Sequence, residues 1–100
     1  MISKVVYLGH LRTEATHLES GNVIITDAPV DNHGNGEAFS PTDLVATALA
    51  SCMITIMGIV AKRYGIDIVG VTAGVEKIMI TDPRRIGEVR IKINFPHPIK

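Results

Sequence analysis

A run of eighteen residues without a charge, from Leu44 to Ala61, constrains the fold of this chain more than any other feature. Its length reaches the lower limit for a helix that crosses a bilayer. The run nevertheless contains polar or small residues that weaken membrane insertion, namely Thr47, Ser51, Thr55 and Gly58. The rest of the chain has amphipathic strand patterns, which need a soluble core to face. We therefore expect a buried central helix in preference to a transmembrane segment, with burial against a partner as the third alternative.

The residues around this run predict where the helix begins and ends. Ser40 is a favourable N-cap, Pro41 suits the first helical position, and Asp43 stands where a carboxylate closes a capping box. Gly65 suits the position just after the last turn. These signals predict a helix over 41–64 that is apolar nearly all round and therefore buried nearly all round. Because a chain of 100 residues has little material to cover such a helix, we expect a homodimer.

Strand-like segments flank the predicted helix on both sides, and a turn-rich loop over 27–39 precedes it. In the last strand-like segment, Val89, Ile91, Ile93 and Phe95 form one apolar face. The order predicts an α+β fold in a single domain over 1–100, with N-terminal antiparallel strands, one long buried central helix and then a β-hairpin. The expected strands are 3–8, 10–18 and 23–26 before the helix, and 66–81 and 86–95 after it.

Composition excludes several classes of function. Ten basic and ten acidic residues cancel, so no net field attracts a nucleic acid or an anionic membrane, and four aromatic residues are too few for a base-stacking platform. One cysteine cannot form an internal disulfide, and the N-terminus lacks the pattern of a signal peptide, so a cytoplasmic location is expected. The four histidines lack the spacing of metal ligands. We expect no metal, no organic cofactor, no nucleic acid and no membrane partner.

Two residues are candidates for chemistry, and each has a plainer alternative. Cys52 lies within the predicted helix, where it is either a small buried hydrophobe or a reactive thiolate. It lies too far from the helix start for the helix dipole to stabilise a thiolate, so reactivity needs a cation from elsewhere. Arg12, on the weakly patterned second strand, is the candidate cation; otherwise it is a solvated charge on an edge strand.

The segment around the helix start resembles the OsmC/Ohr family. It reads Gly36-Glu37-Ala38-Phe39-Ser40-Pro41-Thr42-Asp43-Leu44 and is followed by Ala46, Ala48, Leu49, Ala50 and Cys52. That family has a glycine-rich loop, then Ser/Asn-Pro-x-Glu/Asp-Leu, then an alanine-rich helix that carries the reactive cysteine. The strands before and after the helix also fit.

The resemblance implies an intertwined α+β homodimer. Members of that family reduce organic hydroperoxides with a cysteine thiol. It implies that Cys52 is the peroxidatic cysteine and that Arg12 stabilises its thiolate. In the Ohr branch a glutamate follows the helix-start proline and pairs with the arginine, whereas this chain has Thr42 there. Asp43 or Glu37 could take the role of that acid.

A second departure from the family concerns the end of the chain. The family continues with a further helix that carries a resolving cysteine, whereas this sequence ends before that part. Turnover would therefore require an external thiol reductant. The expected function is that of a thiol-dependent peroxidase that reduces organic hydroperoxides through a cysteine sulfenic acid, in defence against oxidative or osmotic stress. The alternative is a non-catalytic dimeric domain of the same family, in which the cysteine is buried and inert.

Overall fold

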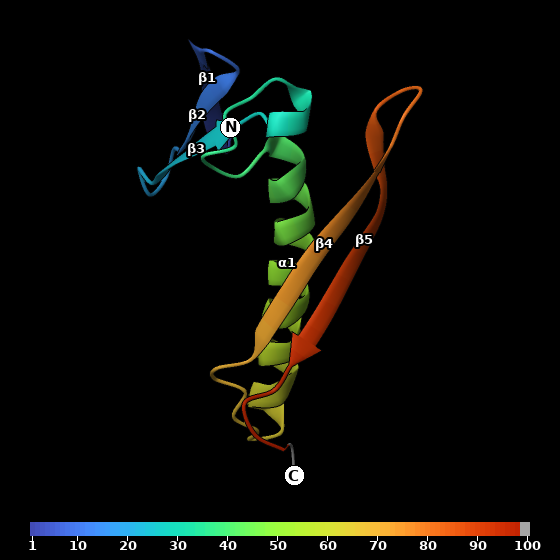
Figure 1. Ribbon diagram of the computed structural model, residues 1–100. Coiled ribbons are helices and arrows are strands. Elements are labelled where there is room, and N and C mark those ends of the chain that lie inside the picture. The colour runs from blue at the N-terminus through green and yellow to red at the C-terminus, as the bar shows by residue number, and fades with distance from the viewer. Residues whose placement is uncertain (99–100) are drawn as a thin grey trace. The chain divides into compact units, whose positions relative to one another are not determined.

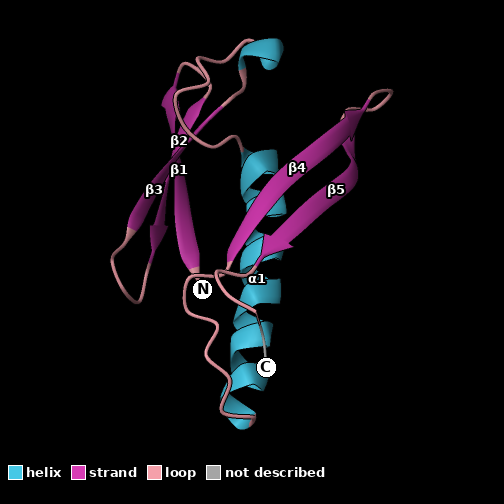
Figure 2. Cartoon of the chain, turned by 60° about the horizontal axis from the view of Figure 1, so that its bottom comes forward, coloured by secondary structure: helices cyan, strands magenta, loops and turns pink. Residues whose placement is uncertain are grey.

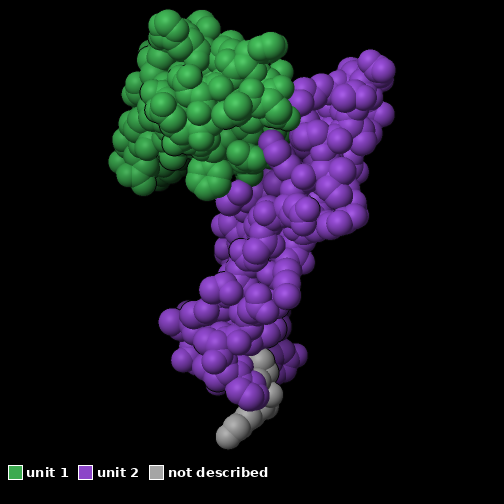
Figure 3. All heavy atoms as spheres, in the orientation of Figure 1, with its two compact units in different colours: residues 1–44 green, residues 45–100 purple. Residues whose placement is uncertain are grey.

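The structure is a computed structural model that describes residues 1–98. It divides into two compact units, residues 1–44 and residues 45–100 (Figure 3). The boundary falls within the first turns of the helix α1 (Pro41–Arg63), so a secondary-structure element runs from one unit into the other. Each unit is described by itself below, and the expectation of one domain over 1–100 stays a prediction.

Unit 1 contains a three-stranded antiparallel sheet in the order β1-β2-β3, with β2 at its centre (Figures 1 and 2). Its strands are β1 (Ser3–Gly9), β2 (Arg12–His17) and β3 (Val23–Asp27). The predicted N-terminal antiparallel strands are therefore confirmed. The second strand begins two residues later than expected, because residues 10 and 11 form the turn between β1 and β2.

The turn between β1 and β2 has an unusual backbone. His10 and Leu11 both have left-handed φ angles, of 54° and 62°, and Gly9 pairs with Arg12 across the turn. Two consecutive positive φ angles are typical of a type I′ turn, whose twist matches the twist of the strands it joins. Leucine rarely adopts this region, and the pair lacks the Asn-Gly or Asp-Gly residues that mark such a turn in a sequence. The turn makes Arg12 the first residue of β2.

The loop between β3 and α1 is folded back on itself. It contains a short 3-10 helix (Val30–Asn32) and is closed by backbone hydrogen bonds to the first residues after β3, including Gly36 N–H to the carbonyl oxygen of Ala28 at 3.2 Å. A Cβ atom on Gly34 would lie 1.7 Å from the carbonyl oxygen of Ala28, so only glycine fits there. The loop is therefore an ordered element that leads from β3 to the helix.

The helix begins and ends as its flanking residues predict. The Ser40 backbone N–H donates to Asp43 Oδ2, and the Asp43 backbone N–H donates to Ser40 Oγ, both at 3.0 Å, which completes a capping box. At the other end Gly65 has a φ of 66°, and the Ile66 N–H donates to the carbonyl oxygen of Ala61 at 2.9 Å. This is the Schellman arrangement, in which a glycine after the last turn ends the helix.

Unit 2 contains most of α1 and an antiparallel hairpin of β4 (Thr72–Ile80) and β5 (Arg85–Asn94). The predicted final hairpin is confirmed, although residues 66–71 lie outside its first strand. In β5, Val89, Ile91 and Ile93 are partly buried while their neighbours along the strand are exposed, as the alternation predicts. Phe95 lies beyond the strand and is exposed.

The burial expected for α1 is not supplied by the single chain. Ala46, Ala50 and Ala61 are its only buried residues in the described part of the chain. Six of its large apolar side chains remain 39 to 60% exposed, namely Val45, Leu49, Met53, Ile56, Ile59 and Val60. By length and composition alone such a helix could also cross a membrane. Within unit 2 the hairpin makes no extensive contact with the helix among the described residues, so the expected burial of α1 by a second subunit stays a prediction.

Candidate functional site

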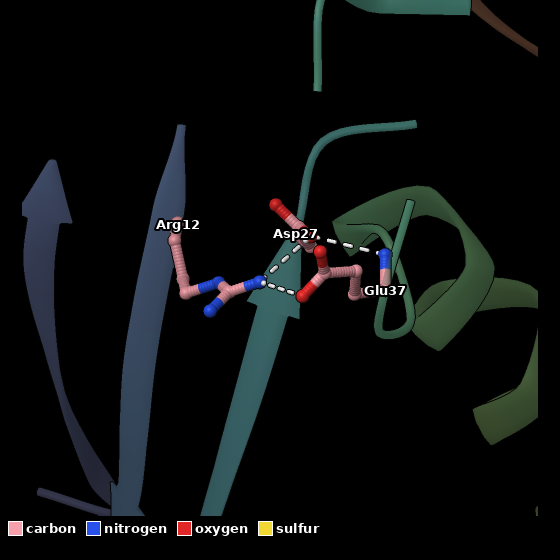
Figure 4. A network of polar contacts seen from close by, with 3 residues as sticks. All are labelled: Arg12, Asp27 and Glu37. Carbon is pink, nitrogen blue, oxygen red and sulfur yellow. Dashed lines mark hydrogen bonds and ion pairs between the residues drawn. The ribbon is translucent and has the colours of Figure 1, made fainter. Parts of the chain in front are cut away.

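Three charged side chains of unit 1 meet where the strand β3 ends and the loop to α1 begins (Figure 4). Arg12 Nη2 lies 3.1 Å from Asp27 Oδ2 and 3.1 Å from Glu37 Oε2. Arg12 is the first residue of β2 and Asp27 is the last residue of β3, and the two are direct partners in the antiparallel register. The ion pair is thus a consequence of strand register, which puts opposite residues within side-chain reach.

The two carboxylates that share this nitrogen differ in burial. The Asp27 side chain is 0% exposed, whereas the Glu37 side chain is 68% exposed. The Asp27 carboxylate also accepts a hydrogen bond from the Glu37 backbone N–H at 3.0 Å, again on Oδ2. Its other oxygen, Oδ1, is buried and has no hydrogen-bond partner among the described residues. Asp27 Oδ2 therefore links the Arg12 side chain on β2 to the Glu37 backbone in the loop.

The charge states of this pair follow from its hydrogen bonds. The Glu37 backbone N–H and the Arg12 guanidinium both bond to the charged carboxylate and hold the pKa of Asp27 below its ordinary value, although burial acts in the opposite direction. Hydrogen bonds to Asp27 and Glu37 raise the pKa of Arg12 above its already high ordinary value. Arg12 and Asp27 therefore form a pair of opposite charges at neutral pH.

The loop presents Glu37 to Arg12 by backbone constraints on both of its sides. Gly36 has a left-handed φ of 66°, which glycine adopts without strain. The carbonyl oxygen of Phe39 accepts a hydrogen bond from the Asp27 backbone N–H at 3.0 Å. Glu37 lies between these two positions, with its backbone bonded to Asp27 and its side chain bonded to Arg12.

The other expected residues lie elsewhere. Asp43, the alternative acid for Arg12, closes the capping box of α1 with Ser40. Thr42 Oγ1 lies 3.2 Å from Ser40 Oγ in the same cap. Cys52 lies on α1 within unit 2, and its side chain is exposed. Because Arg12 belongs to unit 1, the contact between Arg12 and Cys52 implied by the family resemblance stays a prediction.

Asp27 is the member of the network that the sequence does not single out, since it stands at the start of the turn-rich loop over 27–39. The signal that could have found it is register, because a two-residue turn before Arg12 and a turn at Gly21 together bring positions 12 and 27 opposite each other. Within residues 1–98, no three His, Cys, Asp or Glu side chains are grouped so that they could hold a metal ion.

Comparison with known proteins agrees with this architecture. Residues 34–98 match the family of OsmC-like proteins. A crystal structure of an osmotic stress induced and detoxification response protein from Psychrobacter arcticus 273-4 is similar over the whole of this chain, with 62% sequence identity and a TM-score of 0.96. The similarity covers 73% of that longer chain. Among curated proteins, none matches this sequence.

The match to the family covers more than half of the chain and includes the loop, the helix with Cys52 and the hairpin. It confirms the family resemblance drawn from the segment that begins at Gly36. The solved structure extends the likeness in fold to the N-terminal sheet that carries Arg12 and Asp27. The chain belongs to the family of OsmC-like proteins.

Proposed function

We propose that this protein is a cysteine-dependent peroxidase that reduces organic hydroperoxides. The observation that carries the proposal is the Arg12–Asp27–Glu37 network, which holds an arginine beside the loop that leads to the cysteine-bearing helix, in a chain of the OsmC-like family. The detoxification response named for the Psychrobacter arcticus protein agrees with such chemistry. Cys52, the only cysteine of the chain, is the nucleophile in this proposal.

The reaction begins with the Cys52 thiolate, which attacks the terminal oxygen of a hydroperoxide. An S–O bond forms and the O–O bond breaks, so the sulfur is oxidised to a sulfenic acid while the peroxide leaves as an alkoxide and takes up a proton to become an alcohol. Two equivalents of an external thiol then restore the cysteine, releasing water and a disulfide. Arg12 would stabilise the thiolate and the negative charge that develops on the leaving oxygen.

The helix surface around Cys52 favours an alkyl peroxide over hydrogen peroxide. Leu49 and Ile56 lie three residues before and four residues after Cys52, so they share its side of α1, and both are about half exposed. Exposed aliphatic side chains next to the nucleophile contribute binding energy only for a substrate that has a hydrocarbon part. This supports an organic hydroperoxide as the substrate class.

A homodimer is part of the same proposal. Most of the large apolar side chains of α1 are exposed in the single chain. A typical stable interface buries about 800 Å² on each partner, so a second copy has ample surface to cover. We also propose that the protein is soluble and cytoplasmic, where thiol reductants are present.

The direct test is oxidation of Cys52 by an alkyl hydroperoxide, followed by dimedone trapping and mass spectrometry. The wild-type protein should gain one sulfenic acid, and an added dithiol should restore the thiol and permit turnover. Cys52→Ser, which is nearly isosteric, should abolish trapping without altering the fold. If Cys52 resists peroxide under conditions that oxidise free cysteine, the chain is instead a non-catalytic member of the family with an inert thiol.

A further inference from the structure

The two carboxylates on Arg12 are not equivalent partners. Both contact the same atom, Nη2, at the same distance of 3.1 Å, but Asp27 is shielded from solvent and Glu37 is largely exposed. A buried carboxylate depends on its cation, because removing the partner leaves an uncompensated charge. An exposed ion pair is screened by water and contributes little. Asp27 is therefore the constant partner of Arg12, and Glu37 is the one that solvent or a ligand can replace.

Asp27 is also held from several directions. Its backbone pairs with that of Arg12 across the β2–β3 ladder. Its backbone N–H donates to the carbonyl oxygen of Phe39 at 3.0 Å, and its Oδ2 accepts the backbone N–H of Glu37 at 3.0 Å. The carboxylate is thus fixed to the strand and to the loop at the same time. The hydrogen bond to this carboxylate therefore restricts the position of the Arg12 guanidinium.

This arrangement leaves much of the guanidinium available. Arginine has five N–H donors, and the bonds to Asp27 and Glu37 both use Nη2. Nε and Nη1 therefore keep three N–H groups without a described partner in residues 1–98. Donors with a fixed position stabilise a developing oxyanion without reorganising during the reaction. Arg12 can do this only if something other than the ligand holds it.

The burial of Asp27 also indicates that this carboxylate serves to hold Arg12. The buried Oδ1 atom has no hydrogen-bond partner among the described residues, and its desolvation is a cost that an apolar residue would not have. Groups of this kind in native structures are expected to have a role outside stability. The neighbours that carry charge are Arg12 and Glu37, and the carboxylate is bonded to both of these residues.

We propose that Asp27 is a positioning residue for the peroxide reaction, which fixes the Arg12 guanidinium so that its free N–H groups meet the peroxide oxygens in one geometry. This inference rests on the proposed peroxidase function. Asp27 touches neither the thiol nor the peroxide in this role, and it acts through Arg12. Glu37 adds to the hold on Arg12 but is not required for it.

The test compares the rate of Cys52 oxidation by an alkyl hydroperoxide in Asp27→Asn, Arg12→Ala and the double variant, with Glu37→Gln as the matched control. Asp27→Asn should slow oxidation about tenfold or more, as expected when a reacting group is misplaced by about 1 Å. Glu37→Gln should slow it less. In the Arg12→Ala background, Asp27→Asn should have no further effect, since a residue that acts through another loses its influence when that residue is absent.

Chemical rescue gives a readout that a merely structural role would not change. Millimolar guanidinium ion should partly restore oxidation in Arg12→Ala, because the Asp27 carboxylate remains to hold it. The same ion should not rescue the double variant. Circular dichroism and light scattering establish that each variant is folded, and Asp27→Ser replaces Asp27→Asn if the latter does not fold.

The outcomes separate this inference from the proposed function. Wild-type rates in Asp27→Asn, or equal slowing by Asp27→Asn with and without Arg12, overturn the positioning role and leave the peroxidase function standing. Equal rescue of Arg12→Ala and the double variant by guanidinium also overturns it. If the wild-type Cys52 is not oxidised at all, the proposed function fails, and the positioning role falls with it.

Discussion

Arg12 and Asp27 are cross-strand partners, joined by an ion pair of 3.1 Å at the ends of β2 and β3, where the loop to the helix begins. Arg12 owes its place to the two-residue turn before it, and Asp27 owes its place to the end of β3. The ion pair with Asp27 gives the Arg12 guanidinium a defined orientation, which a solvated surface arginine lacks. The predictions below follow from this pair and from the exposed helix.

Arg12→Ala should make the Cys52 thiol less reactive at neutral pH. In the proposed mechanism Arg12 stabilises the Cys52 thiolate, which is the form that reacts, so removing this cation should lower the thiolate fraction. The rate of iodoacetamide labelling at neutral pH should therefore fall. Arg90→Ala is the matched control, because Arg90 pairs with Glu88 on the exposed hairpin. Coincident labelling curves for wild type and Arg12→Ala would assign Arg12 to the solvated surface charges.

The Asp27 carboxylate should make stability depend on acid pH. Its folded pKa lies below the unfolded value of about 3.9, so its contribution is fully present above that value and is lost as the pH falls through the folded pKa. The wild type and Asp27→Asn should therefore differ in unfolding free energy at pH 7 and converge as the pH falls below about 4. Urea unfolding at a series of pH values measures this. A constant difference across that range would contradict it.

Leu11→Gly should stabilise the protein. Leucine in the left-handed region costs roughly 1–2 kcal/mol, and glycine removes that cost but adds about 0.5–1 kcal/mol of backbone entropy in the unfolded chain. The net gain should be about 0.5–1 kcal/mol in thermal or urea unfolding. Leu18→Gly is the control, since Leu18 is similarly exposed but is not among the residues with a positive φ. That variant should be less stable than the wild type.

Gly34→Ala should disrupt the loop that presents Glu37. The new Cβ would meet the carbonyl oxygen of Ala28 at 1.7 Å, so the backbone must move, at a cost of about 1–3 kcal/mol. The displaced loop should also release the Glu37 backbone N–H from Asp27. Gly74→Ala is the control, because the nearest atom to its Cβ would lie 4.0 Å away. Equal stability of the two variants would mean that the loop tolerates a different path.

The protein should be a dimer in solution, held by the exposed surface of α1. Light scattering at micromolar concentration measures the mass directly. Ile56→Asp places a charge on the exposed apolar helix and should produce monomers or aggregates, whereas Val69→Asp, at an exposed residue outside α1, should leave the mass unchanged. A well-behaved wild-type monomer would refute the dimer.

Local signals were sufficient to predict the helix and the order of strands. The Ser40–Asp43 cap and Gly65 act within a few residues of the chain, so their residue types determine the ends of α1 to within one residue. The alternation that predicts the face of β5 is equally local. These features depend on no partner, and the structure confirms them.

Non-local features were less accessible to sequence reasoning. The contact between Arg12 and Asp27 depends on a turn at His10 and Leu11, which lacks the Asn-Gly or Asp-Gly residues that mark such a turn. Glu37 was one of two candidate acids for Arg12, and only the fold of the loop distinguishes it from Asp43. The burial of α1 is a third feature that local sequence signals do not determine, because it depends on what packs against the helix.

The exposed surface of α1 has a consequence for how this chain reaches its native state. A helix that buries only three alanines has not yet gained most of the hydrophobic free energy available to it. If association supplies the remainder, the last step of folding is bimolecular. The native state would then be favoured by mass action, and its melting temperature would rise with protein concentration. Dilution alone would return chains to a partly open form that proteases can cut.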